Sequence, residues 1–156
     1  MLVAGGLVCV VGLSRHEADG LTEATGIRYV FFLLLLTGLN DVAQYVWGKS
    51  LGRRAVAPRI SPRKTWAGLV GGIVTTSVLA AALAAPLLGE DRPRGLLMGV
   101  LIGVGGFAGD IVASAYKRHV GAAESGRMLP GHGGIIDRID SLCVTAPVLY
   151  CMVRFF

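Results

Sequence analysis

Residues 29–47, YVFFLLLLTGLNDVAQYVW, decide what kind of protein this chain can be. The segment is almost wholly apolar up to Gly38, and its length is close to the roughly 20 residues that a helix needs to cross a bilayer. Similar runs recur along the chain, so we expect an all-α polytopic membrane protein with about five transmembrane segments. The other runs lie at 1–13, at 66–88, from about 95 to 115, and from 135 or 142 to 156.

The composition agrees with a membrane protein. Hydrophobic residues make up 53% of the 156 residues, charged residues only 16%, and the mean hydropathy is +0.64. An ordinary soluble domain carries more surface charge than this, and a membrane barrel would have short alternating segments. We expect a single integral-membrane domain spanning residues 1–156. The net charge of +5 favours phosphate-bearing partners, and no nucleic-acid motif is present.

Basic residues are distributed unequally between the connecting loops. Residues 49–64 contain six, and residues 114–140 add four, whereas the two other loops contain two each. The two basic loops are separated by two spans, so they lie on one side of the membrane. The positive-inside rule places that side in the cytoplasm. We expect cytoplasmic loops at about 48–65 and 116–138.

A polar group interrupts the first long apolar run. Asp41, Gln44 and Tyr45 are spaced i, i+3, i+4, so they share one helix face. A carboxylate at membrane depth costs several kcal/mol unless it is paired or hydrated, so Asp41 should face the interior of the bundle. Its role is either to contact a ligand or to pack helices together near the interface.

A second polar group lies where the run at 95–115 ends. Asp110, Ser114, Lys117 and Arg118 follow one helix face as it leaves the membrane. Asp110 could pair with Ser114 and Lys117, or it could hold a divalent cation while the two bases bind phosphates. We favour the cation, because the polar sequence continues beyond this face with further acids.

Residues 60–68, ISPRKTWAG, precede the run at 66–88. Ser61 or Thr65 can cap the helix that follows. A helix N-terminus also presents amide groups and a positive dipole end to an anion, and Arg63 and Lys64 stand beside it. A capped helix with interfacial bases is one interpretation, and a phosphate site is the other.

The longest polar stretch is residues 114–140, SAYKRHVGAAESGRMLPGHGGIIDRID. The glycines at 131, 133 and 134 allow backbone amides to converge on anionic oxygens. Asp137 and Asp140 share a face if the segment is helical, and Arg138 offers a bidentate fork for a phosphate. The alternative is a solvated loop between two membrane helices.

Together these motifs resemble the signature of the phosphatidate cytidylyltransferase family, also called CDP-diacylglycerol synthases. The similarity covers roughly residues 40 to 150 and is carried by a long, specific pattern. Its matching residues are Ser114, Lys117-Arg118, Gly126, Leu129-Pro130, His132-Gly133-Gly134, Asp137-Arg138 and Asp140, with Gly109-Asp110, the block from Ser61 to Gly68 and the block from Asp41 to Lys49 upstream.

The resemblance implies transfer of a cytidylyl group from CTP to phosphatidate, giving CDP-diacylglycerol and pyrophosphate. It implies Mg²⁺ or Mn²⁺ as cofactor, CTP and phosphatidate or a related anionic lipid as partners, a homodimer, and a bacterial inner membrane with the site facing the cytoplasm. The expected catalytic residues are Asp110, Lys117, Arg118, His132, Asp137, Arg138 and Asp140. The expected substrate-binding residues are Asp41, Ser61, Arg63, Lys64, Thr65, Ser114, Gly133 and Gly134. The expected metal ligands are Asp110, Asp137, Asp140 and Glu124.

The chain departs from the family pattern in two ways. A Lys-Asp pair inside the signature is replaced by Ala123-Glu124, and the chain is shorter than typical members. Two other functions therefore stay open. One is a CTP-dependent kinase-like enzyme that acts on a lipid alcohol, and the other is a catalytically silent membrane paralogue that binds acidic lipid.

Overall fold

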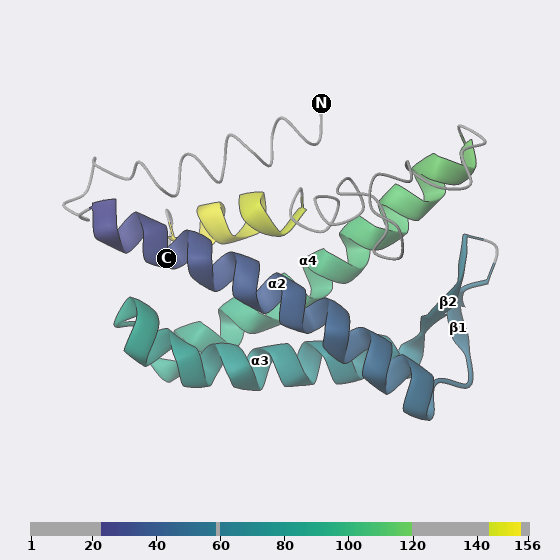
Figure 1. The fold of residues 1–156 in the computed structure, drawn as a ribbon, viewed down its shortest axis with the longest axis horizontal. Coiled ribbons are helices and arrows are strands. Elements are labelled where there is room, and N and C mark those ends of the chain that lie inside the picture. The colour runs from purple at the N-terminus through teal and green to yellow at the C-terminus, as the bar shows by residue number, and fades with distance from the viewer. Residues whose placement is uncertain (1–22, 59, 120–143, 154–156) are drawn as a thin grey trace, which may run out of the picture.

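The computed structural model of the chain describes residues 23–58, 60–119 and 144–153 (Figure 1). Long helices dominate these residues, and a small hairpin joins the first two of them. The elements are α2 (Glu23–Leu51), β1 (Ala55–Ala57), β2 (Ser61–Thr65), α3 (Trp66–Leu88), α4 (Arg92–His119) and a shorter apolar helix, Val144–Val153.

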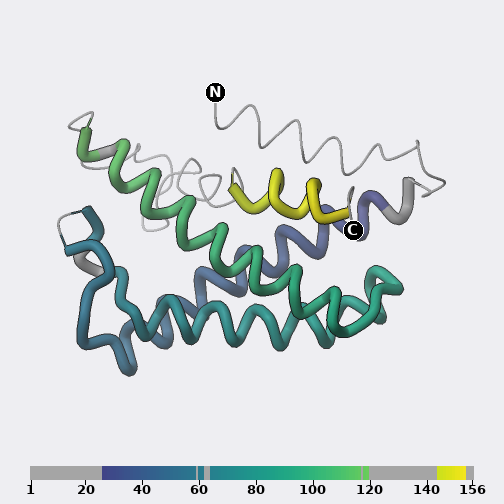
Figure 2. Tube along the Cα trace, turned by 180° about the vertical axis from the view of Figure 1, so that it is seen from behind, coloured from purple at the N-terminus to yellow at the C-terminus, as the bar shows by residue number. Residues whose placement is uncertain are grey.

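The three long helices run back and forth beside one another. α2 leads to the β1–β2 hairpin, α3 returns antiparallel to it, and α4 turns back toward the hairpin end (Figure 1). Seen from behind, α4 lies against α3, and the helix Val144–Val153 lies along α2 and α4 (Figure 2). The C-terminal ends of α2 and α4 and the N-terminal end of α3 therefore gather at one end of the bundle.

The bounds of α3 agree with the predicted run at 66–88 because both of its ends are capped. Thr65 adopts an extended backbone, and its hydroxyl accepts a hydrogen bond from the Gly68 amide at 3.2 Å. At the other end Gly89 has a φ of 73°, and the Gly89 and Glu90 amides donate to the carbonyls of Ala85 and Ala84. Of the two predicted caps, Thr65 is therefore correct, and Ser61 lies at the start of β2.

Within the part of the chain that the structure describes, three helices are long and apolar enough to cross a membrane, at Gly26–Leu51, Trp66–Leu88 and Arg92–Tyr116. The prediction of a helical membrane protein is confirmed. α2 and α4 extend beyond the apolar runs that predicted them, because a helical backbone bonds to itself equally well outside the bilayer. The predicted run at 1–13 and both ends of the last run lie outside the described residues, so the count of five spans stays a prediction.

The bundle core is built mainly on one face of α2. Tyr29, Phe32, Leu33 and Leu36 follow an i, i+3, i+4, i+7 pattern and are buried. They pack with Ala80 of α3, Met98 and Ile102 of α4, and Ala146, Leu149 and Met152 of the last helix. The same face continues to Asn40, whose fully buried side chain accepts a hydrogen bond from Thr76 of α3 at 3.2 Å.

A small hairpin lies within the loop predicted at about 48–65. β1 and β2 pair antiparallel, Ala55 opposite Thr65 and Ala57 opposite Ser61, with an irregular register between the two pairs. The Trp66 amide then donates to the Arg54 carbonyl at 3.1 Å, so the hairpin is tied directly to the start of α3. The hairpin thereby places Lys64, the penultimate residue of β2, at the end of the bundle beside α4.

A polar cluster of Tyr29, Glu90 and Arg94 links the helices at the opposite end of the bundle. The Tyr29 hydroxyl of α2 donates to Glu90 Oε1 at 2.7 Å, and Arg94 Nη1 of α4 contacts Glu90 Oε2 at 2.9 Å. Burial raises the pKa of the Glu90 carboxyl, but the hydrogen bonds from Arg94 and Tyr29 outweigh it, so the pKa lies below its ordinary value. The α3–α4 turn is thus fastened to α2 by an ionised carboxylate.

We expect Tyr29→Phe to lower the free energy of unfolding by about 1–2 kcal/mol at neutral pH, because a hydrogen bond to a charged acceptor is lost. Because the folded-state pKa of Glu90 is depressed, its contribution is present above the pKa in the unfolded chain and is lost as the pH falls through the folded pKa. Thermal unfolding in detergent at several pH values measures both effects. A stability difference that stays constant down to pH 3 would contradict the role given to Glu90.

Candidate functional site

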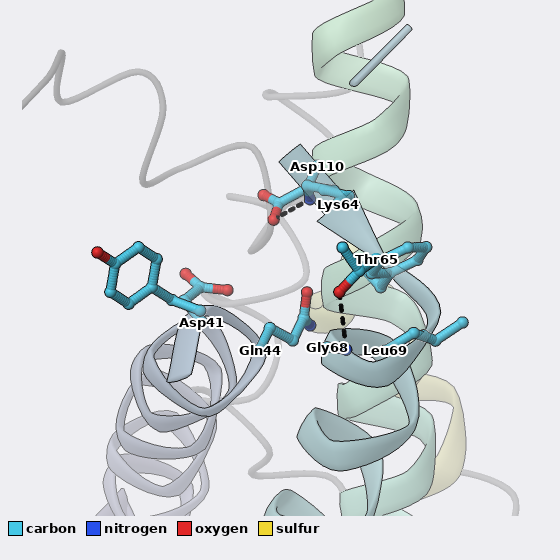
Figure 3. A pocket seen from close by; sticks show the side chains of 9 residues that line it. Asp41, Gln44, Lys64, Thr65, Gly68, Leu69 and Asp110 are labelled. Carbon is cyan, nitrogen blue, oxygen red and sulfur yellow. Dashed lines mark hydrogen bonds and ion pairs between the residues drawn. The ribbon is translucent and has the colours of Figure 1, made fainter. Parts of the chain in front are cut away.

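A pocket lies at the end of the bundle where α2, the hairpin, α3 and α4 meet (Figure 3). It encloses a volume of about 190 Å³. Residues from four separate elements line it, and three of these elements contribute polar or charged side chains. The lining residues are Asp41, Gln44 and Tyr45 of α2, Lys64 and Thr65 of β2, Gly68 and Leu69 of α3, and Phe107 and Asp110 of α4.

The pocket contains an ion pair between Lys64 Nζ and Asp110 Oδ2. Both side chains are mostly buried, at 19% and 25% exposure, so the pair is less screened than one on the surface. Lys64 Nζ also lies 5.2 Å from the centre of the Phe107 ring, a favourable cation–π distance. The ammonium group is therefore held between a carboxylate and an aromatic face, both on α4.

This arrangement gives Asp110 a partner that helical spacing did not indicate. The spacing allowed a pair with Ser114 and Lys117 on the same helix, and the structure pairs Asp110 with Lys64 of the hairpin, while the Lys117 side chain is not among those described. The Ser114 hydroxyl instead donates to the backbone carbonyl of Asp110 at 2.7 Å. The Asp110 carboxylate therefore points into the pocket and not along its own helix.

The N-terminus of α3 forms one wall of the pocket. Two of its first amides are already engaged, since Trp66 donates to the Arg54 carbonyl and Gly68 donates to the Thr65 hydroxyl. Of the two interpretations of this segment, the capped helix is therefore observed, and the phosphate site stays a prediction. For an anion α3 has its positive dipole end, reinforced by Lys64.

Two glycines of α3 let α2 approach closely enough to close the pocket from below. A Cβ at Gly68 would lie 2.7 Å from the Gln44 carbonyl oxygen, and a Cβ at Gly72 would lie 2.4 Å from Gln44 Cγ. Larger residues would push the two helices apart. Both glycines therefore serve close packing of α2 against α3.

The pocket brings together four of the predicted site residues: Asp41, Lys64, Thr65 and Asp110. Ser61 and Ser114 are described but do not line it, and Arg118 is exposed on the last turns of α4. Arg63 lies in β2 and Lys117 in α4, and only their backbones are described. The remaining predicted residues, Glu124, His132, Gly133, Gly134, Asp137, Arg138 and Asp140, lie outside the described residues.

The described part of the chain does not by itself assemble a full metal cage. Among residues 23–58, 60–119 and 144–153, no group of three or more His, Cys, Asp or Glu side chains is close enough to hold a metal ion. Two carboxylates, Asp41 and Asp110, nevertheless line the same pocket. The predicted ligands Asp137, Asp140 and Glu124 fall outside these residues.

Sequence reasoning missed part of the lining. It placed Gln44 and Tyr45 on the face of Asp41, which the structure confirms, but did not include them in the site. Leu69 and Phe107 gave no signal, because an apolar residue in an apolar run reads as core. For Gln44 the signal was present, since an amide within a membrane span needs a partner.

Comparisons with known proteins agree with these motifs. The cytidylyltransferase family matches residues 3–156 of the chain. A protein of Escherichia coli named "Uncharacterized protein YnbB" is 53% identical over 131 residues, which cover 83% of this chain and 44% of that protein. The phosphatidate cytidylyltransferase of Brucella melitensis is 39% identical over 137 residues, 86% of this chain and 50% of that protein. The enzyme of the same name from Bacillus subtilis is 42% identical over 137 residues, which cover 84% of this chain and 49% of that protein. The chain thus spans about half the length of the curated relatives it matches.

Proposed function

Because the chain belongs to the cytidylyltransferase family, we propose that it transfers a cytidylyl group from CTP to phosphatidate, giving CDP-diacylglycerol and pyrophosphate. The observation that carries the proposal is the pocket in which Lys64 and Asp110 converge with Asp41 at the N-terminus of α3. We infer phosphatidate as the lipid acceptor from the relatives named phosphatidate cytidylyltransferase.

The chemistry of this pocket suits the reaction. The phosphate monoester of the lipid is already an anionic nucleophile, so no serine–histidine pair is needed to activate it. What the reaction requires is neutralisation of phosphate charge and in-line positioning at the α-phosphorus. The Lys64 ammonium and the dipole of α3 provide positive charge at one wall. We propose that Arg63, Lys117, Arg118 and Arg138 hold further phosphate oxygens.

The residues present fit Mg²⁺ or Mn²⁺. Magnesium in nucleotide sites is held by one or two carboxylates together with phosphate oxygens, and Asp41 and Asp110 supply two hard oxygen ligands from facing helices. When bound, such an ion would neutralise the triphosphate and favour departure of pyrophosphate. We propose Asp110 as a ligand, joined by Asp137, Asp140 and Glu124, with the Asp41 carboxylate close enough to the substrate to contact it and not required as a ligand.

We propose that the pocket faces the cytoplasm, in the inner membrane of a bacterium. The pocket end carries Lys49, Arg53, Arg54 and Lys64 between α2 and α3, whereas the turn between α3 and α4 carries Arg92 and Arg94. This excess of positive charge at one end favours a cytoplasmic location for it. CTP is a cytosolic nucleotide and would reach the pocket from that side.

Product analysis tests the proposal. Membranes containing the protein are incubated with CTP labelled in the cytosine ring, phosphatidate and Mg²⁺, and the products are separated. We expect labelled CDP-diacylglycerol and an equal amount of pyrophosphate. Release of CDP with a phosphorylated lipid alcohol would identify a CTP-dependent kinase instead. CTP that binds without turnover, or does not bind at all, would indicate a catalytically silent paralogue.

A further inference from the structure

Gln44 is a polar residue of the pocket to which the reaction above gives no task. Its side chain extends from α2 toward the first turn of α3, beside Asp41 and below the Lys64–Asp110 pair (Figure 3). The amide nitrogen is buried, and among the residues that the structure describes it has no hydrogen-bond partner. An amide donor is therefore left at the wall of a pocket that is built for a ligand.

The amide is held in place by packing. The Cγ of Gln44 lies directly against Gly72, and the Gln44 carbonyl lies against Gly68, so the stem is wedged in the groove that these glycines open in α3. A long side chain fixed in this way has already lost rotamer freedom before any ligand arrives. It binds a partner at a smaller entropic cost than a free side chain would.

The position is unfavourable without a ligand. A buried amide donor that is left unsatisfied destabilises the fold, and the apolar setting of a membrane span offers little water to satisfy it. A methionine of similar length would fill the same groove without this cost. The amide is therefore best accounted for by a hydrogen-bond acceptor on a molecule that enters the pocket.

The depth of Gln44 in the membrane span indicates which acceptor its amide would bind. Lys64 and Thr65 precede α3, whereas Gln44 contacts α3 at Gly68 and Gly72, roughly 5 to 10 Å further along the helix axis into the membrane span. In a glycerolipid the ester carbonyls lie on the acyl side of the phosphate, a few bonds away. A lipid whose phosphate reaches Lys64 from the membrane would bring an ester carbonyl to the level of Gln44.

We propose that Gln44 Nε2 donates a hydrogen bond to an ester carbonyl of the lipid substrate, so that Gln44 selects ester-linked over ether-linked lipid. The inference rests on the proposed function and adds to it a residue that recognises the lipid substrate. The nucleotide also carries acceptor oxygens, so the test has to separate the two substrates.

The test compares diacyl phosphatidate with its dialkyl ether analogue, which keeps the phosphate and the chains but lacks both carbonyls. Rates of CDP-lipid formation are measured for the wild type, for Gln44→Met and for Gln44→Glu. Methionine keeps the packing on Gly72 and removes the amide, and glutamate keeps the length and removes the donor. Val46→Met, on the exposed face of the same helix, is the matched control.

We expect the wild type to favour the diacyl lipid by about tenfold in kcat/KM, the size of effect expected for one well-placed hydrogen bond. Both Gln44 variants should lose about tenfold on the diacyl lipid, little on the ether lipid, and keep the KM for CTP. Val46→Met should retain the wild-type ratio.

An unchanged ester-to-ether ratio in both Gln44 variants would overturn the inference while leaving the proposed function intact. A rise in the KM for CTP with that ratio preserved would assign the amide to the nucleotide, and would equally overturn it. If the wild type forms no CDP-lipid from either lipid, the proposed function fails and this inference fails with it.

Discussion

Asp110→Asn is expected to reduce Mg²⁺-dependent turnover of CTP by about a hundredfold or more. Removing one group that compensates charge in a transition state commonly costs 10²–10³ in rate. The amide is close in size to the carboxylate but is a much poorer ligand for a hard cation. The rate of CDP-lipid formation, measured over a range of Mg²⁺ concentrations, gives the loss directly.

The control is Asp91→Asn, which makes the same change at an exposed acid before α4, at the opposite end of the bundle. It should retain full activity. Size-exclusion chromatography and thermal unfolding establish that Asp110→Asn is folded, which matters because Lys64 loses a charged partner in this variant. A folded Asp110→Asn protein with normal turnover would remove Asp110 from the metal site.

Lys64→Met is expected to affect metal binding and CTP turnover in opposite directions. Asp110 is proposed as a metal ligand, so Lys64 would compete with the ion for its carboxylate. Loss of the ammonium should then tighten binding of Mn²⁺ alone by about tenfold, since one nearby charge in a partly buried site is worth about 1–2 kcal/mol. Turnover of CTP should fall by about a hundredfold, because the phosphates lose their cation. Free Mn²⁺ measured by electron paramagnetic resonance gives the first quantity.

A second variant distinguishes release of the Asp110 carboxylate from a general loss of positive charge. Lys49→Met removes the same charge from the end of α2, where Lys49 lies 5.7 Å from the Tyr45 ring and outside the ion pair. It should leave Mn²⁺ binding nearly unchanged, and Lys64→Arg should do the same. Equal tightening in Lys49→Met and Lys64→Met would show that Asp110 is not the group released.

The sequence was most informative where local rules apply. The span at 66–88 was predicted at its observed bounds because a capping threonine and a following glycine mark its ends. The shared face of Asp41, Gln44 and Tyr45 followed from helical spacing alone. Both are consequences of neighbours a few residues apart.

Features that depend on distant neighbours were not predictable in the same way. Asp110 pairs with Lys64, which lies 46 residues away, and helical spacing gave no sign of this partner. The hairpin was missed because β1 is only three residues long and β2 carries proline and two bases, so neither has an alternating pattern. Tertiary contact, not local pattern, fixes both.

The buried pair of Asn40 and Thr76 has a consequence for how the chain enters the membrane. The first half of α2 is strongly apolar, but its second half carries an amide, a carboxylate and another amide within two turns, at Asn40, Asp41 and Gln44. Placed alone in lipid, each of these groups opposes insertion. Once α3 lies alongside, the Thr76 hydroxyl donates to Asn40 Oδ1, and the groove at Gly68 and Gly72 receives Gln44. We therefore expect α2 and α3 to enter the membrane as a helical pair, because α3 shields the polar half of α2 from lipid.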